Sequence, residues 1–215
     1  MYSRDASREE RPEVLKAAIR DLHFASLVTA ADGGILCTHL PMILMEDEDG
    51  TLRLEGHVAR ANPHWRTLSA APASLAIFQG PHAYVSPSWY ATKAETGKAV
   101  PTWTYVSVHA HGRLRVMENT ARLLAHLERL TRRNEDGRAD PWLIKDAPDG
   151  FVEALSRGIV GVELAVERLD GVWKLNQHRS GDDRAGMVAG LREEGKAGAT
   201  RIAELAAGLD VPLAD

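Results

Sequence analysis

The residues best suited to chemistry form one segment, Gly56-His57-Val58-Ala59-Arg60-Ala61-Asn62-Pro63. Asn62-Pro63 is typical of a helix start, because asparagine caps the first turn and proline fits its first position. The free backbone N–H groups of a helix start attract an anion, and Arg60 could donate two hydrogen bonds to a phosphate. The segment therefore predicts an anion site. The alternative is an ordinary capped helix with a surface arginine.

Two further groups of polar residues lie on predicted strands. Thr38 and His39 lie on a strand that would neighbour the anion segment, where a hydroxyl and an imidazole could complete a phosphate pocket. Ser107, His109 and His111 occupy odd positions of another strand, so they share one face. The two histidines could form half of a metal site or bind haem, or they could simply be hydrogen-bonded within the sheet.

A polar run, Lys174-Leu-Asn-Gln-His-Arg179, follows the last apolar segment. Lys174, Gln177 and Arg179 supply hydrogen-bond donors, which could contact a ligand or could cap the sheet and face solvent. Elsewhere no spacing identifies a nucleophile or a metal centre, so we assign no catalytic residue and no metal ligand.

Charge and composition bound the class of protein. The 215 residues are 44% hydrophobic and 26% charged, and the formal net charge is −4. That balance gives no general attraction to nucleic acid or to an anionic membrane, although a local basic patch that contacts DNA is possible. Cys37 is the single cysteine, which excludes an internal disulfide and favours a cytoplasmic protein. No apolar run is long enough to predict a membrane span or a secretory signal.

Hydrophobic periodicity places helices around a β-rich middle. The expected helices lie at about 8–22, from Asn62 to 69, after Asn119, at 149–157 and in a tail over 182–208 that breaks near Gly195. The expected strands lie at 24–30, 35–45, 52–58, 74–79, 83–90, 102–117, 159–166 and 172–175. A loop is expected over 91–101, and hairpin turns are expected at 32–34 and at Asp170-Gly171.

This order of elements predicts an α+β fold that is mainly antiparallel β. Strands joined by hairpins favour an antiparallel barrel over a doubly wound parallel sheet. We expect a barrel domain with helical inserts over residues 1–180 and a helical C-terminal tail, residues 181–215, packed on the same domain.

Several segments resemble the PaiB-like family, in the same order along the chain. They are Phe24-Ala-Ser-Leu-Val-Thr-Ala30, Thr38-His-Leu-Pro41, the segment 56–63, Gly80-Pro-His-Ala-Tyr-Val-Ser-Pro-Ser-Trp-Tyr90, Val100-Pro-Thr-Trp103 and Asp183-Arg-Ala-Gly186. The resemblance implies an FMN-binding split barrel of the pyridoxamine-phosphate-oxidase type with flanking helices. It also implies a cytoplasmic homodimer that holds FMN at the subunit interface and acts as a negative transcriptional regulator.

The resemblance also implies where the flavin lies. Its phosphate side would be formed by Thr38, His39, His57, Val58, Ala59, Arg60 and Asn62, and Ser107, Lys174, Gln177 and Arg179 would approach the flavin or close the dimer. The chain departs from the family pattern at Thr104, Asn176 and His178, so its ligand site could be altered or lost. The functional hypotheses are a flavin-dependent regulator or sensor, an FMN-dependent oxidoreductase, a haem-binding protein and a direct DNA-binding repressor.

Overall fold

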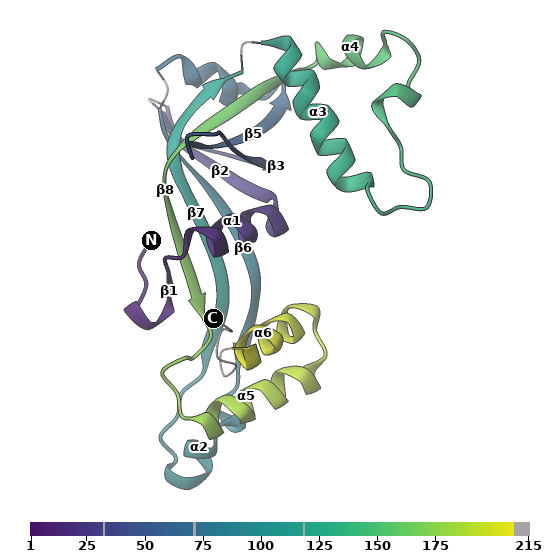
Figure 1. Ribbon diagram of the computed structural model, residues 1–215. Helices are drawn as coiled ribbons and strands as arrows, with labels where there is room; N and C mark the ends of the chain where they lie inside the picture. Colours follow the sequence, from purple (N-terminus) through teal and green to yellow (C-terminus); the bar gives the residue numbers. More distant parts are fainter. Residues whose placement is uncertain (32, 71, 118, 209–215) are drawn as a thin grey trace. The chain divides into compact units, whose positions relative to one another are not determined.

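The protein divides into two compact units, each built from separate stretches of the chain (Figure 1). The computed structural model describes residues 1–31, 33–70, 72–117 and 119–208. Unit 1 comprises residues 1–15, 79–108 and 170–215, and unit 2 comprises residues 16–78 and 109–169. The predicted boundary between a barrel at 1–180 and a tail at 181–215 stays a prediction.

One eight-stranded sheet supplies strands to both units. Seven strands follow the order β3-β2-β6-β7-β8-β5-β4, and β1 pairs with β8. Every pairing with a defined register is antiparallel, so the predicted sheet type is confirmed. The strands are β1 (Arg8–Glu9), β2 (Phe24–Ala31), β3 (Gly34–Pro41), β4 (Ile43–Glu46), β5 (Leu52–Ala59), β6 (Ala73–Val85), β7 (Thr102–Val116) and β8 (Ile159–Lys174).

Helices complete each unit. Unit 1 contains η1 (Asp5–Ser7), η3 (Pro87–Trp89), α2 (Ala91–Thr96), α5 (Gly181–Glu194) and α6 (Ala197–Gly208). Unit 2 contains η2 (Pro63–Ala70), α3 (Thr120–Glu135), η4 (Ile144–Asp146) and α4 (Phe151–Ser156), and α1 (Pro12–Leu22) runs from unit 1 into unit 2. The predicted cap of α3 is confirmed, because Asn119 Oδ1 accepts hydrogen bonds from the N–H groups of Ala121 and Arg122.

The core of unit 1 forms where α5 and α6 pack together beside the end of β6. Met187, Leu191 and Ile202 are completely buried there with Val85. Glycines let α5 approach the η3 segment closely, because a Cβ atom on Gly186 would lie 2.0 Å from the carbonyl oxygen of Trp89. The two predicted tail helices are therefore confirmed, with the break at Gly195 in a left-handed conformation.

The core of unit 2 follows the alternation of its strands. In β2 the side chains of Ala25, Leu27 and Thr29 are buried, and the intervening residues are more exposed. The predicted β2–β3 hairpin is present, with Ala31 opposite Gly34. The Asp32 part of that predicted turn lies outside the described residues.

The hairpin predicted at Asp170-Gly171 is wrong, because β8 continues through both residues as one strand. The glycine is needed for packing rather than for a turn. A Cβ atom on Gly171 would lie 2.3 Å from Leu15 Cδ2 and 3.0 Å from the Glu9 carbonyl oxygen, so β1 and α1 could not cross the strand there. Gly171 instead pairs with Glu9 of β1.

Four other predicted boundaries also change. The strands predicted at 74–79 and 83–90 are one strand, β6, which ends before η3, and the expected loop over 91–101 contains α2. The first helix begins at Pro12, because Arg8–Glu9 forms β1. The strand predicted over 35–45 is interrupted at Met42, whose N–H donates to the His23 carbonyl. Within the described residues, none of the helices has the length and apolar character needed to cross a membrane.

Candidate functional site

The predicted ligand residues fall into two groups, one in each unit. Unit 2 contains Thr38, His39 and residues 57–62 at the end of β5 and just after it, whereas unit 1 contains Ser107 and the polar run 174–179, which begins at the last residue of β8.

Thr38 and Asn62 meet in unit 2, as the sequence predicts, and His64 joins them. Asn62 Nδ2 donates to Thr38 Oγ1 at 3.1 Å, and Thr38 Oγ1 lies 2.9 Å from His64 Nδ1. The His64 N–H donates to Asn62 Oδ1 at 2.9 Å, which fixes the orientation of the amide. We call these three side chains the Thr38–Asn62–His64 network.

His64 is the member that sequence reasoning missed, although it follows the Asn62-Pro63 pair directly. The residue is 2% exposed, and burial lowers the pKa of its imidazole, which favours the neutral ring. If Thr38 accepts from Asn62 and donates to Nδ1, the ring proton lies on Nε2. His64 Nε2 is buried and has no hydrogen-bond partner among the described residues.

A close crossing of strands builds this network. A Cβ atom on Gly56 of β5 would lie 2.9 Å from Leu40 Cδ1 and 3.2 Å from the Pro41 carbonyl oxygen. Because Gly56 has no side chain, β5 can lie against the end of β3, close to Thr38. The helix predicted after Asn62 is present as a 3-10 helix, η2, and the anion site expected at its start stays a prediction.

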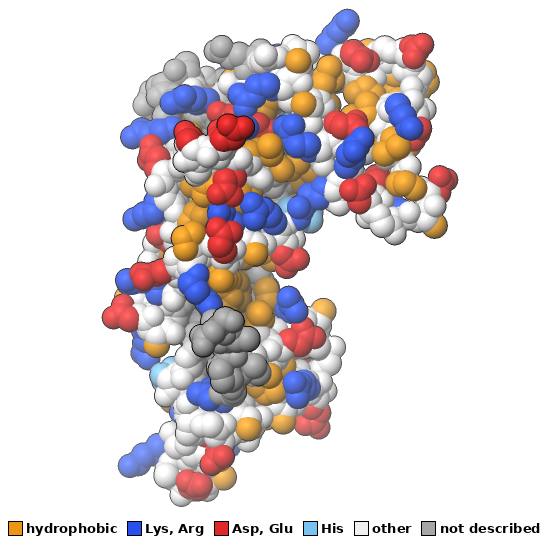
Figure 2. Space-filling model, viewed as in Figure 1, with side chains coloured by type: hydrophobic (Ala, Val, Ile, Leu, Met, Phe, Trp, Pro, Cys, Tyr) orange, Lys and Arg blue, Asp and Glu red, His pale blue; other side chains and the backbone are white. Residues whose placement is uncertain are grey.

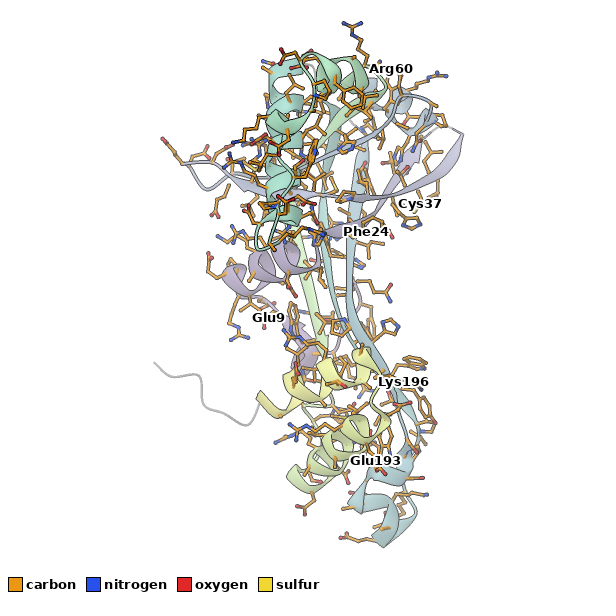
Figure 3. All side chains as sticks on the ribbon, turned by 90° about the vertical axis from the view of Figure 1, so that its right-hand side faces the viewer. Glu9, Phe24, Cys37, Arg60, Glu193 and Lys196 are labelled. Atoms are coloured by element: carbon orange, nitrogen blue, oxygen red, sulfur yellow. The ribbon has the colours of Figure 1, made fainter. Side chains whose placement is uncertain are left out.

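Arg60 contacts the protein itself. Its Nε donates to the Arg157 carbonyl at 2.7 Å and its Nη2 donates to the Ile159 carbonyl at 3.0 Å. The guanidinium also lies 5.9 Å from the centre of the Trp65 ring. Arg60, labelled in Figure 3, therefore anchors the end of β5 to the start of β8, and its proposed contact with a phosphate stays a prediction.

The other predicted residues of unit 2 point to different surroundings, because side chains alternate along a strand. His39 is exposed and lies 3.0 Å from Ser26 Oγ through its Nδ1, on the opposite face of β3 from Thr38. Val58 is buried in the core, whereas Ala59 is exposed at the end of β5.

His57 belongs to a buried charged cluster between β5 and α3. Its Nδ1 lies 3.2 Å from His126 Nε2. Burial lowers the pKa of both imidazole rings. The pKa of His126 falls to about 4, because the charges of His57 and Arg129 lower it further. Glu55 is 1% exposed beside them and accepts hydrogen bonds from Arg122 and Arg129. Burial raises the pKa of Glu55, but these hydrogen bonds bring it below its usual value.

In unit 1, Lys174 and Arg179 line a pocket with a volume of about 390 Å³. Lys174 Nζ donates to Thr102 Oγ1 at 3.1 Å, and the Arg179 guanidinium lies 4.5 Å from the centre of the Tyr90 ring. Segments far apart in the sequence build the walls, and the lining residues are Tyr2, Ser3, Arg4, Ser7, Val100, Pro101, Thr102, Tyr105, Val172, Lys174, Asn176, His178 and Arg179. We call this the cationic pocket.

Two predicted residues of unit 1 do not line the cationic pocket. Gln177 closes the turn after β8, because its Oε1 accepts from the Leu175 N–H and its Nε2 donates to the Trp173 carbonyl. Ser107 is buried within β7.

Two of the three residues that depart from the family pattern, Thr104 and Asn176, have hydrogen-bond partners, and the third, His178, lines the cationic pocket. Thr104 is buried and donates to the Ala83 carbonyl at 3.1 Å. Asn176 Nδ2 donates to the Tyr90 hydroxyl at 2.9 Å. In unit 2 the His109 and His111 rings are 6.3 Å apart, and His111 Nε2 lies 3.1 Å from an Arg168 nitrogen.

Comparison with solved structures shows the fold. The FAD and heme binding protein from Mycobacterium smegmatis is 15% identical with a TM-score of 0.60, over 83% of this chain and 78% of that one. The flavocytochrome Anf3 from Azotobacter vinelandii is 15% identical with a TM-score of 0.55, over 81% and 70%. This likeness confirms the predicted split-barrel fold, an antiparallel sheet with flanking helices.

Comparison of sequences shows the family. Residues 1–168 match the family described as "Putative FMN-binding domain". The chain is 34% identical to the "Protease synthase and sporulation protein PAI 2" of Bacillus subtilis, over 87% of each chain. It is 33% identical to an uncharacterized protein of Emericella nidulans, over 91% of this chain and 92% of the other. The chain therefore belongs to the PaiB-like family of FMN-binding domains.

Proposed function

We propose that this protein is an FMN-dependent regulatory flavoprotein and that the Thr38–Asn62–His64 network in unit 2 contacts the flavin. The observation that carries this assignment is the buried His64 Nε2, which lacks a partner among the described residues. A buried donor without an acceptor costs about 1–3 kcal/mol, so a ligand oxygen that accepts from it gains that energy.

The donor set of the network fits FMN. The phosphate, ribityl and ring carbonyl oxygens of FMN all accept hydrogen bonds, and the network offers the His64 Nε2–H as a donor, held in place by Thr38 and Asn62. Burial lowers the pKa of His64, so its neutral ring can donate from Nε2 without placing an additional charge in the site. The family match, which covers residues 1–168, includes all three side chains.

A bound flavin supplies one- and two-electron redox chemistry, and the protein binds and orients it. In the proposed function the chain holds the flavin and reports its state to a partner. The relative named for protease synthesis and sporulation supports a regulatory role, and we propose that the protein is a cytoplasmic homodimer. The exposed free thiol of Cys37, labelled in Figure 3, suits a reducing compartment.

The alternatives are an FMN-dependent oxidoreductase and a haem-binding protein. The fold neighbours whose names include haem or flavocytochrome, together with the His109–His111 pair, keep these alternatives open. Reduction of bound flavin by NADPH, followed by reoxidation over many turnovers, would favour the enzyme. A Soret shift on haem titration that is lost in His109→Ala would favour haem binding.

Two conservative variants test the flavin assignment. Thr38→Val removes the hydroxyl at nearly constant volume, and His64→Gln removes the imidazole. We expect each variant to weaken FMN binding about tenfold, because one good hydrogen bond is worth about 1.4 kcal/mol or more in a buried site. The measurement is quenching of flavin fluorescence, with circular dichroism to verify folding.

The matched control is Thr120→Val, which changes an exposed threonine at the start of α3. The control should bind FMN as the parent does. If folded Thr38→Val and His64→Gln proteins also bind FMN as the parent does, the network does not contact the flavin.

A further inference from the structure

We propose that the cationic pocket of unit 1 is a second ligand site, which binds a small amphipathic anion other than FMN. The ligand would carry a phosphate or carboxylate on an apolar or aromatic body. The proposal rests on the charge and construction of this pocket.

Three cationic side chains line the pocket, Arg4, Lys174 and Arg179, and none of its lining residues is an aspartate or a glutamate. This is unusual in a chain whose net charge is −4. Burial lowers the pKa of the nearby His178, and the charges of Arg179, Arg4 and Lys174 lower it further. Like charges gathered in one pocket repel each other, so an anion that neutralises them binds favourably.

The cations differ in how firmly they are held. Arg179 is held by Asp183 Oδ2 at 3.4 Å and by the Tyr90 ring. Lys174 lies 5.8 Å from the centre of the Tyr105 ring and is hydrogen-bonded to Thr102. Arg4 makes neither a hydrogen bond nor an ion pair with its side chain among the described residues, so it remains available to a ligand.

The fold brings these residues together from distant positions. β1 pairs with β8, with Arg8 opposite Val172, so the N-terminal segment lies beside the strand that ends at Lys174 (Figure 1). Gly171 permits this approach, as described above. The N-terminal wall of the pocket is therefore fixed by strand pairing rather than by a chance contact of a free end.

The turn after β8 is held in a costly conformation at the pocket. Asn176 has a φ of 60°, is 3% exposed and is held by the Tyr90 hydroxyl and by Met187 Sδ. Asparagine tolerates this left-handed region better than most residues, and such outliers gather at ligand sites. The left-handed conformation of Asn176 determines the direction of the backbone between Lys174 and Arg179.

The rest of the lining determines the class of ligand. The pocket also has apolar lining residues, which are Val100, Pro101, Tyr105 and Val172. A volume of about 390 Å³ is within the range of small-molecule sites. An aromatic phosphate or carboxylate can pair with the cations and also pack against the apolar lining residues. Inorganic phosphate can only pair with the cations.

The cationic pocket and the proposed flavin contacts are separate groups of residues. The Thr38–Asn62–His64 network lies in unit 2, and the pocket lies in unit 1. Lys174, His178 and Arg179 also follow residue 168, where the match to the FMN-binding family ends. A ligand of the pocket can therefore differ from the ligand that names the family.

The test uses phenyl phosphate as the probe, with the full-length protein and isothermal titration calorimetry. We expect saturable binding that is at least tenfold weaker in Arg4→Gln and in Lys174→Met, and inorganic phosphate should bind more weakly than phenyl phosphate. Arg4→Gln is the decisive variant, because the Arg4 side chain makes no hydrogen bond or ion pair among the described residues. Lys98→Met, which changes an exposed lysine of unit 1, is the matched control.

A parallel FMN titration of the same variants distinguishes the two ligands. FMN affinity should be unchanged in Arg4→Gln. Absence of phenyl phosphate binding to the parent, or equal binding by the parent and Arg4→Gln, would overturn the proposal. A matching loss of FMN affinity would overturn it as well, because the pocket would then belong to the flavin site.

Discussion

At the scale of single residues, buried histidines distinguish unit 2. His64 and His126 are 2% and 0% exposed, and each ring has one buried nitrogen without a partner among the described residues. Burial lowers the pKa of both, so both rings favour the neutral state in the folded protein. For His64 we assign the unused nitrogen to the flavin, whereas His126 faces the buried charges of β5 and α3.

His126 should make the protein sensitive to acid. Its pKa is about 4 in the folded protein and near 6.5 in the unfolded chain, so below about pH 6.5 the unfolded chain binds a proton that the folded protein does not. Stability is therefore full above pH 6.5 and falls as the pH drops towards 4, with a loss of about 2 kcal/mol at pH 5. Urea unfolding at pH 7 and pH 5 measures this loss.

In His126→Gln that difference between the two pH values should shrink by roughly the same 2 kcal/mol. The absolute stability of the variant is not the readout, because the substitution also changes packing. His82→Gln replaces an exposed imidazole and should keep the pH dependence of the parent. An unchanged pH dependence in His126→Gln would contradict the lowered pKa.

At the scale of elements, glycines fix how strands and helices cross. The sequence predicts the amphipathic helix after Asn119, the β2–β3 hairpin and the two tail helices, because their signals are local. It does not predict that Gly171 lies inside a strand, because the reason is the side chain of Leu15, distant in sequence. Glycine at a close crossing and glycine in a turn look alike in a sequence.

Replacing a glycine of α5 by alanine tests whether that glycine is needed for close packing. Helix propensity and close packing predict changes in stability of opposite sign. In an isolated helix, replacing an interior glycine by alanine stabilises by up to about 1 kcal/mol. In this protein, Gly186→Ala should instead destabilise by about 1–3 kcal/mol, because its Cβ would lie 2.0 Å from the Trp89 carbonyl oxygen. Gly181→Ala is the control, since a Cβ there meets nothing within 4 Å. Stabilisation by Gly186→Ala in thermal unfolding would refute the close packing of α5 on η3.

The candidate site was predicted in the same partial way. Thr38 and Asn62 could be predicted from the strand and cap signals around them, and the structure brings them together. His64 could not be chosen from the sequence, because its burial and its contact with Thr38 depend on the folded structure. Arg4 was also missed, because strand pairing of β1 with β8 brings the N-terminal segment to Lys174.

At the scale of the whole molecule, charge weighs against direct binding to DNA as the means of regulation. Lysine and arginine side chains alternate with aspartate and glutamate on the face shown in Figure 2. The formal net charge is −4, whereas DNA-binding domains gather excess positive charge on one face. Regulation through a bound flavin and a second anionic ligand is consistent with that balance, because it needs only local cations such as those of the cationic pocket.

A direct titration of FMN with the purified full-length protein tests whether this chain binds FMN. We expect saturable quenching of flavin fluorescence with a shifted flavin absorbance spectrum. A protein that is folded, purifies without colour and produces no spectral change at saturating FMN would contradict the account.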